Sequence, residues 1–138
     1  MIQAEFAKVW MEHGKFGILN LCPRFGKIYT TINILEQLAP DVSIMIAYPD
    51  LKIKASWEAD FKTRKYKNKN IIYTTHLSLH KHKDITVDVL IIDEIHLLSD
   101  AQIEVVKEMI NTHDKVLGLT GTLSNWTERI LQAELQMS

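Results

Sequence analysis

Two carboxylic acids, Asp93 and Glu94, directly follow a nearly all-apolar run that covers residues 87–92. Such a run predicts a buried strand, so carboxylates at its end need a partner that compensates for lost hydration. A magnesium ion on nucleotide phosphates is one such partner. The first carboxylate holds the ion through water, and the second orients an attacking water. The alternative is that Asp93 caps a helix and Glu94 is solvated.

A second candidate site lies where a predicted strand runs into a predicted helix through Gly26 and Lys27. Backbone N–H groups and the helix dipole in such a loop bind phosphate, and Lys27 adds a mobile positive charge. The full P-loop pattern also has glycine at position 21 and Ser or Thr at position 28. This chain has Leu21 and Ile28 there. A glycine turn that enters a helix is an equally good interpretation.

A third polar segment, Thr120-Gly121-Thr122, follows the last predicted strand. Its hydroxyls could link the acidic pair to groups beyond the sheet, or the segment could be an ordinary turn between a strand and a helix. In a parallel sheet, ligands bind beyond the carboxyl ends of the strands. The three segments therefore converge on one end of one predicted sheet.

Apolar runs alternate with amphipathic segments along the whole chain. The runs predict strands over residues 16–21, 42–48, 71–74, 87–92 and 116–119. The periodic segments predict helices over residues 2–12, from Ile28 to a stop at Pro40, from an Asp50 cap to Phe61, around Leu77, from Ser99 or Asp100 to Ile110, and over 126–135. Strands separated by helices, without hairpin turns, predict an α/β fold: a three-layer parallel sheet.

Length and composition fit one globular domain over residues 1–138. The chain has 16 Lys and Arg against 17 Asp and Glu, and one cysteine. No apolar run is long enough to span a bilayer and the N-terminus is unlike a signal peptide, so we expect a cytoplasmic protein without membrane contact. Residues 1–83 carry a net charge of +6 and residues 84–138 one of −7. Seven of the basic residues fall between Lys52 and Lys69. This block is either a solvated face or a surface for phosphates.

Other reactive side chains favour simpler interpretations. His76, His80 and His82 lack the carboxylate or thiol partners that would complete a metal site. Cys22 has no nearby base in the sequence that would activate it as a nucleophile. Trp57 and Phe61 have the spacing of core residues on one helix face, in preference to base-stacking platforms.

Taken together, the segments CPRFGK, DEIH and TGT resemble the phosphate loop, the DEAD/DEAH box and the third motif of superfamily-two helicases. The resemblance is to the first RecA-like lobe, a P-loop NTPase domain, in DEAD/DEAH-type proteins common in phages. It extends from about Phe16 to Leu135. AYPDLKIKASWEADF and YTTHLSL resemble the family's segments that contact nucleic acid.

The resemblance implies roles for individual residues. Lys27 would contact the β and γ phosphates of ATP, Asp93 would hold Mg²⁺, and Glu94 would activate water. The nucleotide-binding loop would comprise Pro23, Arg24, Phe25, Gly26, Lys27 and Ile28. Nucleotide state would be coupled to nucleic acid through His96, Thr120, Gly121 and Thr122. The nucleic-acid path would include Pro49, Lys52, Thr75, His76 and Ser78.

Two departures from the family pattern weaken the expected turnover. Ile28 replaces the Ser or Thr that is a direct magnesium ligand in the family, so the phosphate loop is degenerate. The family's second lobe, with its arginine finger, is missing from these 138 residues, and its loss could cost about 10³–10⁵ in rate.

The predicted protein is thus the ATP-binding lobe of a helicase or translocase, with ATP and Mg²⁺ as cofactors. Its partners would be DNA in preference to RNA, and a second RecA-like lobe in cis or in trans. The alternative is a catalytically degenerate lobe that acts as a regulatory or binding module. If the protein is encoded by a phage, it would act in the host cytoplasm.

Overall fold

A computed structural model describes residues 16–20 and 27–120 of the chain. Its strands are β1 (Phe16–Asn20), β2 (Ile44–Tyr48), β3 (Ile71–Thr75), β4 (Val89–Ile92) and β5 (Val116–Thr120). Its α-helices are α2 (Lys27–Glu36), α3 (Leu51–Thr63) and α4 (Asp100–Thr112), and its 3₁₀ helices are η1 (Leu79–His82) and η2 (Ile95–Leu97). The helices predicted over residues 2–12 and 126–135 lie outside the described residues.

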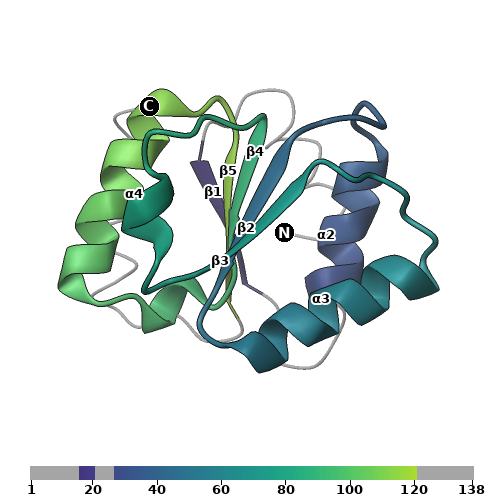
Figure 1. Ribbon diagram of the computed structural model, residues 1–138, viewed down its shortest axis with the longest axis horizontal. Helices are drawn as coiled ribbons and strands as arrows, with labels where there is room; N and C mark the ends of the chain where they lie inside the picture. Colours follow the sequence, from purple (N-terminus) through teal and green to yellow (C-terminus); the bar gives the residue numbers. More distant parts are fainter. Residues whose placement is uncertain (1–15, 21–26, 121–138) are drawn as a thin grey trace.

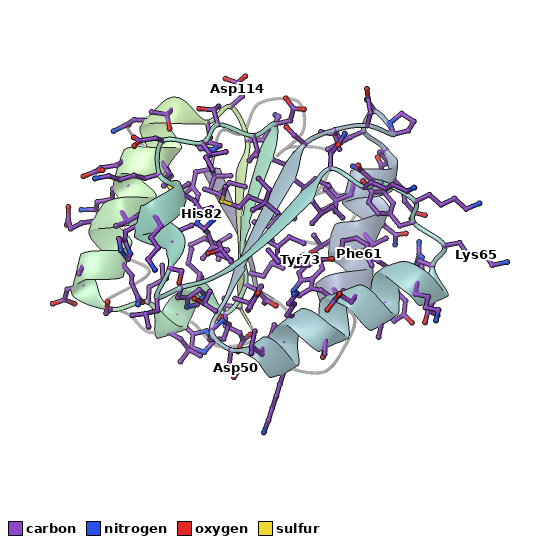
Figure 2. All side chains as sticks on the ribbon, viewed as in Figure 1. Asp50, Phe61, Lys65, Tyr73, His82 and Asp114 are labelled. Carbon is purple, nitrogen blue, oxygen red and sulfur yellow. The ribbon has the colours of Figure 1, made fainter. Side chains whose placement is uncertain are left out.

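The five strands form one parallel sheet in the order β1-β5-β4-β2-β3. Helices α2 and α3 cover one face, and α4 covers the other (Figure 1). The predicted three-layer α/β fold is therefore confirmed. Because all strands run the same way, their carboxyl ends lie together. Asp50, which follows β2, and Asp114, which precedes β5, mark opposite ends of the sheet (Figure 2).

Alternate side chains of the central strands pack into two separate cores. Ile44 and Ile46 of β2 belong to the core under α2 and α3, together with Trp57 and Phe61. Met45 and Ala47 belong to the core under α4. This division follows from the twofold repeat of a strand, which sends successive side chains to opposite faces. It explains why the sequence of β2 is apolar throughout.

The helix starts follow the predicted capping residues. The Asp50 carboxylate accepts hydrogen bonds from the backbone N–H of Lys52 at 2.9 Å and of Ile53 at 3.2 Å. Ser99 and Gln102 form a reciprocal capping box at the start of α4. Each bond satisfies a backbone donor that the first helical turn leaves without an internal partner.

Several predicted boundaries were wrong by one or more residues. Strands β2 and β4 begin two residues later than predicted, after reciprocal bonds between Ser43 and Asp88. Helix α2 ends at Glu36, four residues before Pro40. The helix predicted around Leu77 is a turn followed by η1, and the apolar anchor is the buried Leu79, whereas Leu77 is 76% exposed.

No helix among the described residues has the length and apolar character needed to cross a membrane.

Candidate nucleotide-binding site

Asp93, the first residue after β4, is fully buried at the carboxyl end of the sheet. Its carboxylate accepts one hydrogen bond from Trp57 Nε1 at 2.8 Å and another from the backbone N–H of Glu94 at 2.9 Å. Its own backbone N–H donates to the carbonyl of Ala47 on β2 at 2.8 Å. These bonds offset the cost of placing a carboxylate beside the core. They also fix its orientation.

Glu94 has a left-handed backbone conformation, with φ of 52° and ψ of 49°. An L-residue there costs about 1–2 kcal/mol relative to the right-handed helical region. The conformation turns the chain sharply from β4 into η2. A glycine would adopt it without strain, so the residue type at position 94 is not explained by backbone fit. Strain of this kind concentrates at functional sites.

The η2 turn brings His96 to the end of the neighbouring strand β5. His96 Nδ1 lies 2.7 Å from Thr120 Oγ1, within hydrogen-bond distance, and His96 Nε2 lies 3.8 Å from Glu94 Oε2. Gly118 of β5 makes room for this turn, because a Cβ there would lie 2.6 Å from Ile95 Cδ1. Two of the predicted coupling residues, His96 and Thr120, are therefore in direct contact.

His76 is buried, unlike the exposed contact that the nucleic-acid path implies. Its Nε2 lies 2.7 Å from the carbonyl oxygen of Asp93. Because a carbonyl only accepts, Nε2 carries the proton and donates it. Burial lowers the pKa of His76 below 6.5, and the bond to Asp93 opposes this shift without reversing it. The ring is therefore a neutral donor that supports the turn after β4.

Strand β1 ends and helix α2 begins at the same end of the sheet as Asp93. Asn20, the last residue of β1, pairs with Thr120 of β5, and Lys27 is the first residue of α2. Ile28 is half-buried and packs against the core under α2 and α3, which accounts physically for an apolar residue at this position. The remaining predicted loop and coupling residues lie outside the described residues: Pro23, Arg24, Phe25, Gly26, Gly121 and Thr122.

The other predicted nucleic-acid residues follow β2 and β3 at this same end. Pro49 comes directly after β2, and Lys52 lies exposed in the first turn of α3. Thr75 ends β3, and its Oγ1 accepts a hydrogen bond from the backbone N–H of Ser78 at 3.1 Å. Among the described strands, β2 and β3 lie on the far side of β4 from β5 and β1. The strand that leads to Asp93 therefore lies between the strands that end in the predicted nucleic-acid residues and those that lead to the predicted nucleotide loop and to Thr120.

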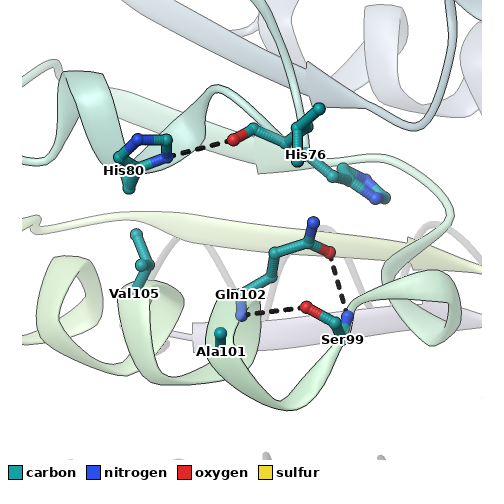
Figure 3. A pocket seen from close by; sticks show the side chains of 7 residues that line it. His76, His80, Ser99, Ala101, Gln102 and Val105 are labelled. Carbon is teal, nitrogen blue, oxygen red and sulfur yellow. Dashed lines mark hydrogen bonds between the residues drawn. The ribbon is translucent and has the colours of Figure 1, made fainter.

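A cavity of about 240 Å³ opens beside this site, between the turn after β3 and the start of α4 (Figure 3). Its lining is mostly apolar. The residues that line it are His76, Leu77, His80, Ser99, Ala101, Gln102 and Val105. The cavity is on the α4 side of the sheet, away from α2, and so is distinct from the predicted phosphate site.

The donor atoms available at the site suit a hard cation. Asp93 and Glu94 supply carboxylate oxygens, which are preferred ligands of Mg²⁺. On Asp93, the Trp57 indole and the Glu94 N–H bind different carboxylate oxygens. Within the described part of the chain, no three His, Cys, Asp or Glu side chains gather as a metal cluster. An ion held by phosphates and one or two carboxylates needs no such cluster.

A five-stranded parallel sheet with helices on both faces is the fold of a RecA-like domain. The chain is similar to the crystal structure of the UvsW helicase from bacteriophage T4, with a TM-score of 0.74 and 16% identity over 96% of this chain and 55% of that chain. It is similar to the Pyrococcus furiosus Hef helicase domain, with a TM-score of 0.72 and 13% identity over 97% of this chain and 35% of that chain. The chain thus spans about half of one structure and a third of the other.

Residues 5–125 match the ResIII family, described as the res subunit of type III restriction enzymes, and the chain belongs to this family. The family places it as an N-terminal, ATP-binding lobe of superfamily-two helicases. A comparison with curated protein sequences finds no significant match. The predicted membership of this superfamily is confirmed.

The sequence analysis did not predict the bond from Trp57 to Asp93. The apolar spacing of α3 predicted correctly that Trp57 is a core residue. An indole carries one N–H, which when buried usually finds an acceptor. That rule indicates that Trp57 has a partner, but the sequence does not say which.

Proposed function

We propose that this lobe binds ATP with Mg²⁺ between the loop before α2 and the acidic turn after β4. The residues that would contact nucleotide are those from Pro23 to Ile28, and Asp93 would hold the ion. The observation that carries the proposal is the position of Asp93 and Glu94 at the sheet end where β1 leads into α2. Bound Mg²⁺ would neutralise charge on the phosphates.

The other residues of the site would serve binding and coupling. Lys27 would bind the β and γ phosphates, and Glu94 would orient water. The contact between His96 and Thr120 would couple the presence of ATP or ADP to nucleic-acid binding. Gly121 and Thr122, which follow Thr120, would take part in the same coupling. We infer that Pro49, Lys52, Thr75 and Ser78 lie along a nucleic-acid path, with DNA as the expected polymer. Lysines and hydroxyls bind phosphates independently of sequence.

We further propose that the 138 residues act with a second RecA-like lobe, supplied in the same chain or by another. The support is the coverage of the two helicase structures, of which this chain matches 55% and 35%. Ile28 makes the phosphate loop degenerate, because isoleucine offers no hydroxyl to a metal ion. Slow hydrolysis by this chain is the expected consequence.

Calorimetric titration with ATP and Mg²⁺ tests the proposal. The unaltered chain should bind, and Lys27→Ala should weaken binding by about tenfold or more, since an ionic contact with phosphate is worth at least 1.4 kcal/mol. Lys69→Ala is the matched control, because Lys69 is an exposed lysine in the loop before β3. Equal affinity of all three proteins would overturn the proposal.

A regulatory or binding module is the second candidate function. It is favoured by the packing of Ile28 against the core, because this side chain then stabilises the fold and contributes no ligand to a metal ion. Ile28→Thr separates the two candidates. If the variant hydrolyses ATP faster with DNA and a second lobe present, the chain is an enzyme lobe with a weakened site. If both proteins bind DNA equally well without nucleotide and neither hydrolyses ATP, it is a binding module.

A further inference from the structure

The indole of Trp57 forms a buried bridge between helix α3 and the acidic turn after β4. Trp57 is fully buried, and its Nε1 lies 2.8 Å from Asp93 Oδ2. Its ring lies 5.7 Å from that of Phe61, which stacks on Tyr66 at 5.1 Å. The aromatic contacts and full burial hold the indole in place. A rigid donor therefore meets a carboxylate that is itself fully buried.

The Asp93 carboxylate accepts a hydrogen bond on each of its two oxygens. The backbone N–H of Glu94 binds Oδ1, and the Trp57 indole binds Oδ2. One bond alone would leave the carboxylate free to rotate about its Cβ–Cγ bond. Bonds to both oxygens restrict this rotation and so define the plane of the carboxylate. The backbone bond depends on the local turn, whereas the indole bond comes from a residue 36 positions earlier.

We propose that Trp57 is a positioning residue that orients Asp93 toward the magnesium ion of bound nucleotide. This inference rests on the proposed function, in which Asp93 holds that ion. Hydrogen bonds from an outer shell orient ligating groups, and their loss typically costs about 10–100-fold in metal affinity. Trp57 is fully buried and bonds to Asp93, so its effect on the ion would pass through Asp93.

The substitution Trp57→Phe removes the N–H and keeps an aromatic ring in the core. Phe61→Leu is the matched control, because Phe61 is buried in the same cluster and has no polar group. Both variants should lose stability, but only Trp57→Phe should lose metal affinity. Mn²⁺, a stand-in for Mg²⁺, would be titrated by electron paramagnetic resonance into each protein saturated with ADP. We expect about tenfold or weaker Mn²⁺ binding in Trp57→Phe and unchanged binding in Phe61→Leu.

The outcomes separate this inference from the proposed function. If the unaltered chain binds Mn²⁺ with ADP and Trp57→Phe binds it equally well, the inference is overturned and the nucleotide site stands. Equal losses in Trp57→Phe and Phe61→Leu would also overturn it, since the effect would then be one of core packing. If the unaltered chain binds ADP and no metal, both the assignment of Asp93 and the inference fail.

A second measurement keeps Trp57 in place and so serves if Trp57→Phe does not fold. The chain has three tryptophans, so three indole N–H signals are expected in a ¹⁵N correlation spectrum. Trp10→Phe and Trp126→Phe assign the Trp57 signal by elimination. Adding Mg²⁺ to the ADP complex should shift this signal, because the ion changes the charge of its acceptor. A Trp57 signal that stays fixed while Mg²⁺ binds would overturn the inference.

Discussion

His96 Nδ1 and Thr120 Oγ1 lie 2.7 Å apart, which joins the turn after β4 to the last residue of β5. The two residues are 24 positions apart in the chain, and both come from segments that the sequence marked as polar ends of strands. Parallel pairing of β4 with β5 brings these ends together. The contact provides a physical link between the acidic pair and the segment that begins at Thr120.

Replacing the Thr120 hydroxyl tests this link. Thr120→Val keeps the shape of the side chain and removes the hydrogen bond, so it should lower the free energy of unfolding by about 1 kcal/mol. If Thr120 couples nucleotide to DNA binding as proposed, Thr120→Val should also reduce the change in DNA affinity that ATP causes. Urea denaturation and an oligonucleotide titration measure the two effects. Thr120→Ser retains the hydroxyl, and a loss of coupling in this variant equal to that in Thr120→Val would contradict the role.

The left-handed backbone at Glu94 makes a prediction about strain. Glycine adopts this conformation freely and alanine does not, so Glu94→Gly should be more stable than Glu94→Ala by about 1 kcal/mol. Both variants remove the carboxylate, so their comparison cancels the effect of charge. Thermal or urea unfolding gives the difference directly. If the alanine variant were the more stable one, position 94 would not have positive φ in the folded protein.

The sequence predicted the sheet and the grouping of polar segments at one of its ends because these depend on local patterns. Apolar runs gave the strands, and Asp50 and Ser99 gave the helix starts. The polar segment after each strand then had to fall at one end of the sheet. The bonds of Asp93 to Trp57 and His76 could not be predicted in this way, because their partners are 36 and 17 residues away and are selected by packing. The strain at Glu94 arises from the same packed turn.

The burial of His76 makes the stability of the protein depend on pH. Its pKa in the folded protein is below the ordinary value of 6.5 because of burial. As the pH falls through 6.5, the unfolded chain takes up a proton before the folded one does, so stability decreases toward the folded-state pKa. His76→Gln keeps an N–H donor for the Asp93 carbonyl and cannot titrate. Its stability should decrease less between pH values of about 7.5 and 5.5.

Urea unfolding at both pH values measures this difference. His80→Gln is the control, because His80 is an exposed histidine on the neighbouring η1 helix. That variant should follow the unaltered chain. If His76→Gln lost as much stability on acidification as the unaltered chain, the buried histidine would not be the source of the pH dependence.

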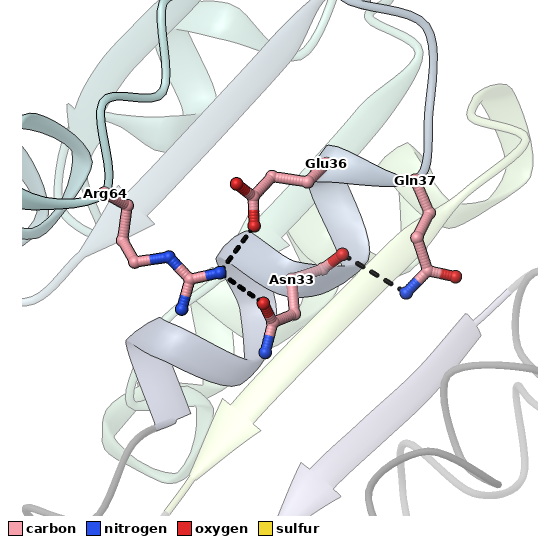
Figure 4. Close-up of polar contacts among 4 residues, drawn as sticks. All are labelled: Asn33, Glu36, Gln37 and Arg64. Atoms are coloured by element: carbon pink, nitrogen blue, oxygen red, sulfur yellow. Dashed lines mark hydrogen bonds and ion pairs between the residues drawn. The ribbon is translucent and has the colours of Figure 1, made fainter.

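Arg64 fastens the end of α3 to α2. Its Nη2 donates to Glu36 Oε1 at 2.6 Å and to Asn33 Oδ1 (Figure 4). Its guanidinium also lies 5.6 Å from the centre of the Tyr29 ring. The groups are partly exposed, so Arg64→Ala should cost about 1 kcal/mol in the free energy of unfolding. Arg64→Lys should recover only part of this loss, because an ammonium lacks the planar donor group.

Salt distinguishes the charged part of this contact from packing. The loss in Arg64→Ala should shrink at about 1 M salt, where charges are screened beyond about 3 Å. Urea unfolding at low and high salt provides the comparison. An effect of the same size under both conditions would contradict an electrostatic role for Arg64.

The most direct test of the whole account is a double-mutant cycle between Lys27 and Asp93, with the affinity for ATP and Mg²⁺ as the measured quantity. If both residues serve one nucleotide, Lys27→Ala and Asp93→Asn should each weaken binding. The double variant should then differ from the product of the single effects by about tenfold, because groups in one network couple by about 0.5–3 kcal/mol. Independent effects of the two substitutions, or no effect of either, would contradict the claim that the start of α2 and the acidic turn form one site.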